Sequence, residues 1–468
     1  MSGPPPQLPP QIATSLSRRV AEAQRRWRTP SVAVRVVRAG EVQLDAASGS
    51  ADLGPDGRSG ETLAPGADVQ YRMGSITKTF TAALVLQARD EGLLDLDDRL
   101  DAHLSVPKHG EISLRRMLSH LSGLQREPVG EVWESLRGPD LPDLLSGLSE
   151  AEPVLAPHAR WHYSNLAYAL LGQVVARRRG GTWEDVLATH LLEPLGLKRT
   201  TTSPTAPVAR GYFPDPYADR LLPEPLFPGH GFAPAAELWT TTADLARWAA
   251  FWAQPDPAVL APATVAEMTH LHAMADLRGW SLGWGLGLML HRRGERMYVG
   301  HDGAMPGFLA SMLVHRDSRL GVVVLMNTSR GADPLSLALD LAGQVLEAVP
   351  DDPAPWRPGA PVPADVEPLL GPWWTEGMEF VLSWRSHPDG SDPDVDGPDG
   401  GHVELASSRA PEGTPPAVLR RDGNDRWRVV SGREQGELLR VVRNDAGAVS
   451  RLYWATYPMT RAPLPFGA

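Results

Sequence analysis

The chain has 468 residues, a formal net charge of −11 and no cysteine, and its length predicts roughly two or three domains. The lack of cysteine excludes disulfides, thiolate metal sites, iron–sulfur clusters and a cysteine nucleophile. The acidic balance argues against nucleic-acid binding, and only three of the 45 basic residues are lysines, Lys78, Lys108 and Lys198.

The first ten residues are rich in proline and predict a disordered tail over residues 1–10. They lack the basic start and the apolar core of a secretory signal. Further along, the apolar runs have the length of a strand, far short of the ~20 residues that a membrane span needs. We therefore expect a cytoplasmic protein with no membrane partner.

Apolar spacing predicts a β-rich start, a long helical middle and a β-rich end for residues 11–348. Helical spacing covers residues 11–27, 79–92, 166–179 and 243–252, and strand-like runs cover 31–37, 41–47, 297–300, 309–315 and 320–327. The last run is continuously apolar, which is typical of a central strand. This order predicts one sheet completed by both ends of the domain, with a helical insertion.

Residues 349–366 are rich in Pro, Asp and Ala and predict a linker. Beyond it, short strand-like runs alternate with Gly, Asp and Pro turns, at residues 379–384, 403–405, 426–430, 438–443 and 449–457. This spacing predicts a small antiparallel barrel or sandwich over residues 367–468. The Asp spacing of residues 387–401 is similar to a calcium loop, but the terminal Glu is missing, so we favour a hairpin loop.

One of the three lysines belongs to the motif Ser75-Ile76-Thr77-Lys78 at the start of a predicted helix. If the helix begins there, the Ser75 and Lys78 side chains share one face. A serine hydroxyl needs a base to become a nucleophile, and a desolvated lysine can be neutral enough to serve. Alone, the motif is weak, because a capping serine followed by a solvated lysine has the same pattern.

Two further motifs follow in chain order. Tyr163-Ser164-Asn165 precedes the helix predicted at 166–179, so its phenol and amide can point the same way, to relay a proton and to hold a lysine and a substrate carbonyl. His301-Asp302-Gly303-Ala304 enters a β run, where glycine lets a ligand approach the backbone. The N–H groups of Ala304 and Ser75 then form a candidate oxyanion hole. Singly, each motif also fits a turn or a helix cap.

Together and in this order, the three motifs resemble those of the serine β-lactamase and penicillin-binding-protein superfamily, in the class C-like branch with Tyr-x-Asn. Matching stretches at residues 91–98, 112–124, 238–246 and 300–308 extend the resemblance over about residues 11–348. The resemblance implies catalytic roles for Ser75 (acylated nucleophile), Lys78 (its base) and Tyr163 (second proton-transfer group), and substrate-binding roles for Asn165, His301 and Gly303.

The same resemblance implies an α+β fold, in which an antiparallel sheet is flanked by helices and a helical subdomain borders the catalytic cleft. No metal or cofactor is expected. The segment 367–468 resembles, more weakly, the lipocalin-like β-barrel of some D-aminopeptidase-like members. We expect this barrel to be structural or to restrict the cleft, rather than to bind a ligand of its own.

The third motif departs from the Lys-Thr-Gly that is usual in the lactamases. His301 is mostly neutral at pH 7 and replaces the permanent cation that would hold a substrate carboxylate. We therefore predict a serine hydrolase that acts through an acyl-enzyme on a small ester or amide. A D-aminopeptidase, a DD-peptidase or a weak β-lactamase is the alternative, and a catalytically idle scaffold that binds a ligand or partner belongs to a different class. The natural substrate and the oligomeric state stay open.

Overall fold

The computed structural model describes residues 7–54, 56–57, 63–350, 358–359, 361–386 and 400–464. The chain divides into two compact units, a larger one over Gly3–Asp351 and a smaller one that includes Asp352–Ala468. Residues 1–6 of the predicted tail and residues 387–399 of the predicted hairpin loop lie outside the described residues. Leu8, however, is packed in a hydrophobic core, and the first helix begins at Pro10, so the chain is folded before residue 11.

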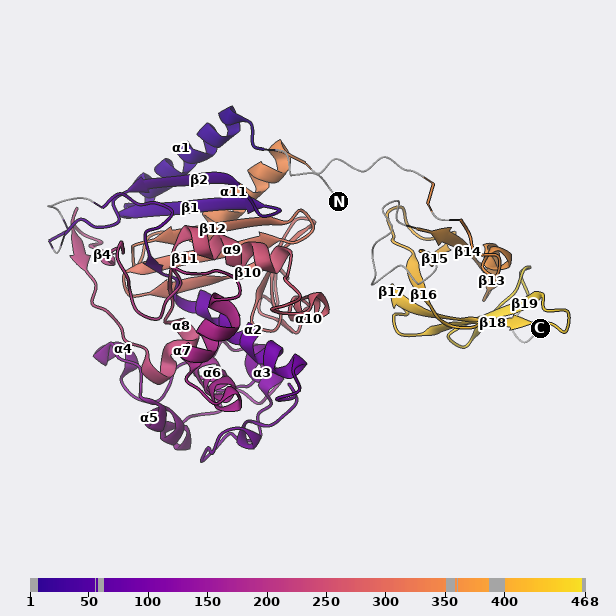
Figure 1. Ribbon diagram of the computed structural model, residues 1–468, viewed down its shortest axis with the longest axis horizontal. Helices are drawn as coiled ribbons and strands as arrows, with labels where there is room; N and C mark the ends of the chain where they lie inside the picture. Colours follow the sequence, from indigo (N-terminus) through magenta and orange to yellow (C-terminus); the bar gives the residue numbers. More distant parts are fainter. Residues whose placement is uncertain are drawn as a thin grey trace. The chain divides into compact units, whose positions relative to one another are not determined.

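An eight-stranded antiparallel sheet lies at the centre of the larger unit, in the order β2-β1-β12-β11-β10-β9-β8-β7 (Figure 1). Its strands are β1 (Ser31–Arg38), β2 (Glu41–Gly49), β7 (Ala273–Met274), β8 (Leu282–Trp284), β9 (Met289–Arg293), β10 (Arg296–Met305), β11 (Phe308–His315) and β12 (Leu320–Met326). Because β1 pairs with β12, both ends of the unit complete one sheet, as the sequence predicts.

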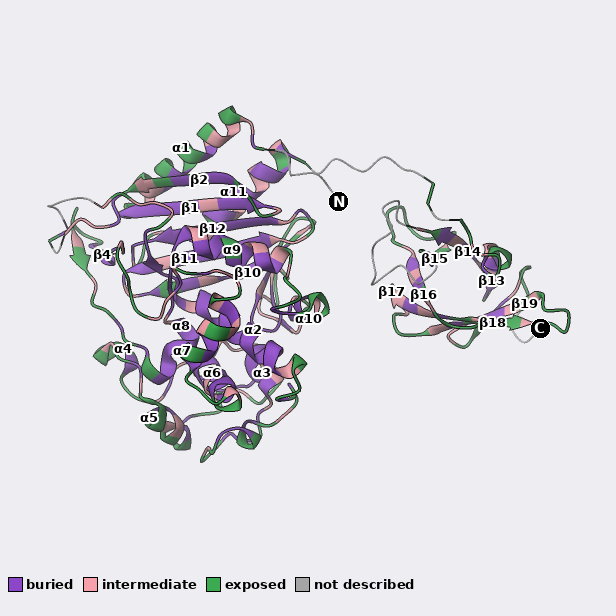
Figure 2. Ribbon diagram, viewed as in Figure 1, coloured by how far each residue is buried: buried purple, intermediate pink, exposed green. Residues whose placement is uncertain are grey.

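The two faces of this sheet are covered by different helices, since side chains alternate along a strand. Val32, Val34 and Val36 of β1 pack in one core with α1 (Pro10–Trp27) and α11 (Pro334–Ala348). Ala33 and Val37 belong to the core on the other face, with α9 (Thr242–Ala253). All seven residues of β12 are buried (Figure 2), which confirms the predicted central strand.

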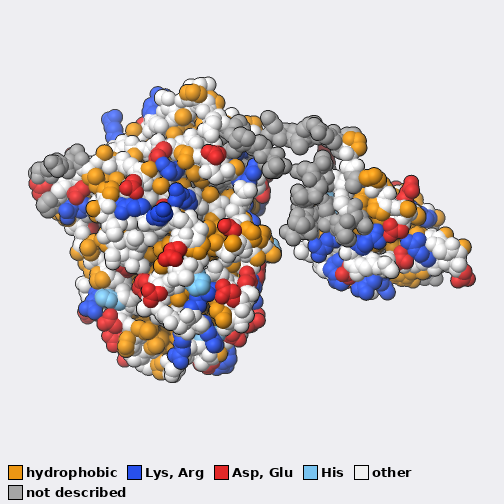
Figure 3. Space-filling view, in the orientation of Figure 1, with side chains coloured by type: hydrophobic (Ala, Val, Ile, Leu, Met, Phe, Trp, Pro, Cys, Tyr) orange, Lys and Arg blue, Asp and Glu red, His pale blue; other side chains and the backbone are white. Residues whose placement is uncertain are grey.

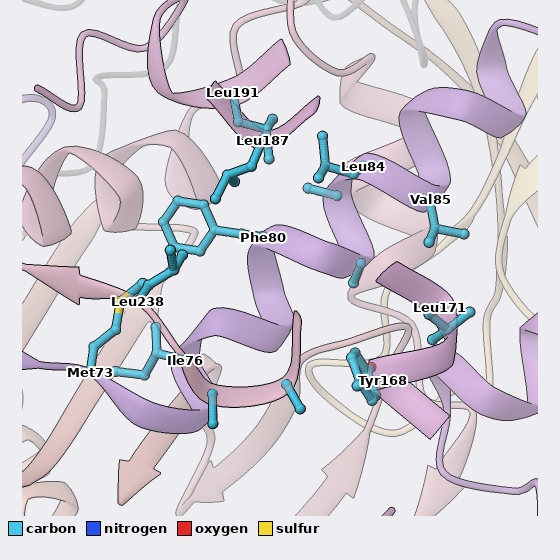
Figure 4. Close-up of a cluster of buried hydrophobic side chains, with 14 of the residues drawn as sticks. Met73, Ile76, Phe80, Leu84, Val85, Tyr168, Leu171, Leu187, Leu191 and Leu238 are labelled. Atoms are coloured by element: carbon cyan, nitrogen blue, oxygen red, sulfur yellow. The ribbon is translucent and has the colours of Figure 1, made fainter. Parts of the chain in front are cut away.

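A helical region fills the chain between β2 and β7. It contains α2 (Thr77–Asp90), α3 (Leu114–Leu118), α4 (Val132–Ser135), α5 (Leu141–Ser146), α6 (Asn165–Arg179), α7 (Trp183–Leu187), α8 (Ala233–Ala236), α9 and α10 (Pro262–Met268), with the short strands β3 (Tyr71–Arg72), β4 (Tyr212–Pro214), β5 (Leu221–Pro223) and β6 (Trp239–Thr240). Twelve of the 14 residues of α2 are buried. Phe80 and Leu84 of α2 lie in one apolar cluster with Tyr168 of α6 (Figure 4), so the start of α2 is held inside the protein.

The smaller unit is a nearly closed antiparallel barrel. Its strands pair in chain order and are β13 (Gly371–Thr375), β14 (Met378–Arg385), β15 (His402–Ser407), β16 (Ala417–Gly423), β17 (Arg426–Ser431), β18 (Leu438–Arg443), β19 (Val449–Trp454) and β20 (Tyr457–Met459). A bridge between Trp374 and Thr460 joins the first strand to the end of the last. Trp373, Trp384 and Trp427 are buried in the barrel core.

On the face seen in Figure 3, basic and acidic side chains of the described residues are mixed and are not gathered into one basic surface. None of the helices in the described residues is both long and apolar enough to cross a membrane.

Candidate active site

Ser75 lies in a single helical turn, η1 (Gly74–Ile76), that leads directly into α2. The Nζ of Lys78 lies 3.1 Å from the Oγ of Ser75 and 2.8 Å from the carbonyl oxygen of Ala235. The Lys78 side chain is fully buried, and this burial holds its pKa well below the ordinary value, although the carboxylate of Glu127 acts in the opposite direction. A buried amine next to a serine hydroxyl is a candidate general base.

Tyr163 and Asn165 meet Ser75 from the start of α6. Ser164 caps this helix, because its side chain accepts a hydrogen bond from the N–H of Ala167. The phenol of Tyr163 hydrogen-bonds the Ser75 side chain, and its ring centre lies 4.9 Å from the Nζ of Lys78. Burial raises the pKa of Tyr163 above its ordinary value. The phenol therefore keeps its proton at neutral pH, whereas burial favours the neutral form of the lysine.

The strand β10 lies against the turn that carries Ser75. A Cβ built on Gly303 would lie 1.9 Å from the carbonyl oxygen of Met73, and one built on Gly74 would lie 2.7 Å from the amide nitrogen of Ala304. The two backbones therefore touch, and the Ser75 and Ala304 residues both line the same cleft. Because Gly303 has no side chain, the turn that carries Ser75 can pack directly against it. From the sequence we had expected a ligand to occupy this space.

One edge of β10 is open where it passes this turn. β10 pairs with β9 only up to Gly300, whereas its pairing with β11 continues to Met305. Residues 301–305 thus leave an unpaired backbone edge on the side where β9 has ended. An unpaired edge of this kind can bind an extended substrate through main-chain hydrogen bonds.

His301 is buried and uncharged. Burial lowers its pKa to about 3, and the nearby Lys78 adds to the effect. Its Nδ1 lies 2.6 Å from the carbonyl oxygen of Asp302. The Asp302 carboxyl accepts a hydrogen bond of 2.7 Å from Ser311 on β11, and burial raises its pKa to about 6. The third motif therefore supplies no cation at neutral pH.

A family model described as Beta-lactamase matches residues 16–347. The chain belongs to the β-lactamase family. A second model, described as a domain of unknown function, matches residues 362–461 and so covers the strands of the barrel.

The relatives of this β-lactamase-family chain include penicillin-binding proteins and a D-aminopeptidase. Penicillin-binding protein 4 of Amycolatopsis lactamdurans is 29% identical over 346 residues, which are 68% of this chain and 88% of that protein. The D-aminopeptidase of Brucella anthropi is 25% identical over 452 residues, 90% of this chain and 74% of that enzyme. The octameric penicillin-binding protein homologue from Pyrococcus abyssi superposes with a TM-score of 0.63 at 20% identity, over 96% of this chain and 99% of that one. The predicted fold class is confirmed, and the chain is a serine hydrolase of the β-lactamase family.

The cleft of this hydrolase includes a charged pair that the sequence argument did not find. The cleft has a volume of about 590 Å³, and Arg126 and Glu127 line it. The Oε1 of Glu127 lies 2.8 Å from the Nδ2 of Asn165, which donates a hydrogen bond to it, and 3.4 Å from the Nε of Arg126. Asn165 was expected to orient Lys78 and a substrate carbonyl; its amide nitrogen is bonded to Glu127, and its amide oxygen has no hydrogen-bond partner among the described residues.

Aromatic rings form much of the remaining wall of the cleft. Trp133, Trp161 and Trp284 line it together with Tyr163. The ring of His120 packs at 4.4 Å from that of Tyr163 and at 4.8 Å from that of Trp284. The tryptophans come from three separate segments, so no local pattern in the sequence groups them. His120 lies in one of the stretches that carry the family resemblance, but nothing there indicates that its buried ring packs against the cleft residues Tyr163 and Trp284.

Proposed function

We propose that the chain hydrolyses a small ester or amide through an acyl-enzyme on Ser75. The observation that carries this proposal is the contact of 3.1 Å between Ser75 Oγ and a fully buried Lys78 whose pKa is lowered. A neutral amine at this distance can take the hydroxyl proton as the oxygen attacks. The phenol of Tyr163, bonded to the same hydroxyl, stands as the second proton-transfer group.

The reaction then has two halves. Ser75 Oγ attacks the carbonyl carbon, its proton passes to Lys78, and the N–H groups of Ser75 and Ala304 stabilise the oxyanion. The tetrahedral intermediate expels the alcohol or amine, which takes the proton through Tyr163. Water then attacks the acyl group, its proton returns along the same path, and the acid leaves with Ser75 restored.

The lining of the cleft supports a substrate without a free carboxylate at the third motif. His301 is uncharged at neutral pH. Arg126 is the one Lys or Arg side chain among the described residues that line the cleft, and its charge is offset by Glu127. This favours esters and amides over β-lactams and the carboxylate-terminated peptides of DD-peptidases. The D-aminopeptidase relative, which matches 90% of the chain, favours amides of D-amino acids as the second candidate.

The test is active-site labelling of the full-length chain with a fluorophosphonate. We expect a single covalent adduct on Ser75, and hydrolysis of p-nitrophenyl acetate that disappears in Ser75→Ala. An idle scaffold would instead give no adduct and an activity equal to that of Ser75→Ala. That result, obtained with a folded protein, would overturn the proposal. Comparing D-alanyl amides with short esters then separates a peptidase from an esterase.

A further inference from the structure

The two ends of the barrel in the smaller unit are closed differently. At one end the short helix η6 (Glu367–Leu369) packs on the barrel core, in which Leu369 is buried together with Val366. The indole N–H of Trp373 donates a hydrogen bond of 2.7 Å to the carbonyl oxygen of Leu369. At the opposite end, where β13 turns into β14 and β19 turns into β20, the described residues form no helix.

This opposite end contains a pocket of about 570 Å³, almost as large as the catalytic cleft. Its lining comes from the β13–β14, β15–β16, β17–β18 and β19–β20 connections and from the strand ends beside them. Phe380, Leu405 and Ala417 line the pocket and also belong to the barrel core, so its floor is the inside of the barrel. Pockets of this volume at the mouth of a barrel can hold a small molecule.

One buried hydrogen-bond donor in this pocket has no acceptor. Trp454 lies on the inner face of β19, since it comes two residues after Leu452, which is fully buried in the core. Its ring packs edge-on with that of Phe380, and the ring centres are 5.1 Å apart. The Nε1 of Trp454 is the one buried side-chain nitrogen or oxygen of the lining that has no partner among the described residues. Buried indole N–H groups usually find an acceptor, so this one indicates an acceptor that a ligand supplies.

The charges of the lining indicate that this acceptor is uncharged. Among the described residues, the charged side chains that line the pocket are those of Glu376, Arg433 and Glu434. The Nε of Arg433 lies 3.6 Å from the Oε1 of Glu434, so the guanidinium already faces a carboxylate. The acidic balance disfavours an anionic ligand such as a fatty acid. An ammonium group would suit the charge but has no acceptor for the indole N–H, whereas a carbonyl oxygen has one.

We propose that the open end of the barrel binds an uncharged, largely apolar molecule whose carbonyl oxygen accepts a hydrogen bond from Trp454. The apolar part of the ligand packs on Phe380, Leu405 and Ala417, which removes apolar surface from water. This pocket shares no lining residue with the cleft at Ser75, so the inference does not depend on the proposed hydrolysis. It gives the barrel a ligand of its own, whereas from the sequence we expected a structural or cleft-restricting barrel.

The test uses benzophenone, an uncharged aromatic ketone that forms covalent bonds with neighbouring C–H groups when it is irradiated. The full-length protein is labelled at increasing concentrations of benzophenone, and the labelled peptides are identified by mass spectrometry. We expect saturable labelling of residues that line the pocket, such as Met378. Diphenylmethane has the same rings without the carbonyl group, and 4-benzoylbenzoate adds a carboxylate. Diphenylmethane as a competitor of labelling, and 4-benzoylbenzoate as a label itself, should both show weaker binding than benzophenone.

Trp454→Phe removes the indole N–H and keeps an aromatic ring. We expect it to raise the Kd of benzophenone by ~5-fold, the effect of losing one hydrogen bond, and to leave the Kd of diphenylmethane unchanged. Trp374→Phe is the matched control, because it makes the same change on a barrel residue that does not line the pocket, and it should keep the wild-type Kd.

Four results would each overturn the inference. The first is no saturable labelling of the pocket, as expected if another segment of the protein occupies it. The second and third are equal binding of benzophenone and diphenylmethane, or tighter binding of 4-benzoylbenzoate, by the wild-type protein. The fourth is an unchanged Kd of benzophenone in Trp454→Phe. The first three comparisons need no variant, so they decide the question even if Trp454→Phe does not fold.

Discussion

At the scale of single residues, the proposed chemistry depends on the ability of the Lys78 amine to accept and release a proton. Lys78 is buried and touches Ser75, whereas Lys108 donates a hydrogen bond to the carbonyl of Ala151 and does not line the cleft. Arginine is found at most other basic positions of this chain, but its guanidinium keeps its proton near neutral pH. The chain has arginine at nearly all of its basic positions, but Lys78 should not tolerate replacement by arginine.

We predict that Lys78→Arg lowers kcat/KM for p-nitrophenyl acetate by ~10²–10⁴-fold, the range that general bases contribute. Lys108→Arg is the matched control and should retain the wild-type rate, since it makes the same chemical change away from the cleft. Steady-state rates of the three proteins, with circular dichroism to check folding, provide the measurement. A fully active Lys78→Arg enzyme would contradict the mechanism.

From the sequence we identified candidate site residues that belong to local motifs. We missed residues that reach the cleft from other segments once the chain is folded. Ser75 and Lys78 are three positions apart at a helix start, so local geometry alone places them together. Glu127 lies three positions after the recognised stretch 112–124, but a charged residue in a loop is usually solvated, and nothing local indicates that its Oε2 is buried. Trp284 reaches the cleft from β8 only because the sheet forms.

At the scale of elements, β10 shows why a local pattern underestimates a strand. The apolar spacing predicts a strand only over 297–300, and Asp302 and Gly303 beyond it are poor strand formers. The structure continues the strand to Met305, since its pairing with β11 runs from Val299 to Met305. Pairing between strands is not visible in the spacing of one segment. Residues 301–305, by which the observed strand exceeds the predicted one, include Gly303 and Ala304, which contact the turn that carries Ser75.

The contact between β10 and η1 leads to a prediction for Gly303. In Gly303→Ala the new methyl group would lie 1.9 Å from the carbonyl oxygen of Met73, so β10 must move away from the turn. The Ser75 and Ala304 amides then separate, and we expect kcat to fall by ~10²-fold or more, the cost of losing one oxyanion-hole donor. Full activity in Gly303→Ala would show that this close approach is not needed.

A control for this change is available in α11. Gly343 lies inside the helix, and a Cβ built there meets no atom within 4 Å. We expect Gly343→Ala to leave kcat unchanged and to raise the free energy of unfolding by ~0.5–1 kcal/mol, because alanine loses less backbone entropy than glycine in a helix. Comparing kcat of Gly303→Ala with that of Gly343→Ala distinguishes the effect of a methyl group at the β10–η1 contact from the general effect of replacing glycine by alanine.

At the scale of the whole larger unit, the site is built from distant parts of the chain. η1 lies near the start of the helical region and β10 follows that region, and the sheet closes only when β1 pairs with β12. Hydrolytic activity therefore requires that both ends of this unit are folded together. Loss of activity in urea consequently measures the unfolding of this unit and is independent of the barrel tryptophans.

The same unit contains buried groups whose ionisation opposes folding in acid. Burial lowers the pKa of His301 to about 3 and of His291 to about 4, and it lowers that of His120 as well. Each of these histidines contributes stability that is complete above pH ~6.5, the pKa of an unfolded histidine, and is lost as the pH falls towards the folded value. Burial raises the pKa of Asp302 to about 6 and of Glu237 to about 7, so these two carboxyls act in the opposite direction.

Between about pH 6 and pH 4 the histidines outweigh the two carboxyls, so unfolding takes up protons and the free energy of unfolding should fall as the pH falls. Urea midpoints at several pH values, read as residual p-nitrophenyl acetate hydrolysis, measure the slope. His291→Gln should make it shallower, and the exposed His270→Gln should not, since that side chain is solvated in both states. A midpoint that rises on acidification, or a His291→Gln slope equal to that of the wild type, would contradict the assignment of the buried histidines as the groups that limit stability in acid.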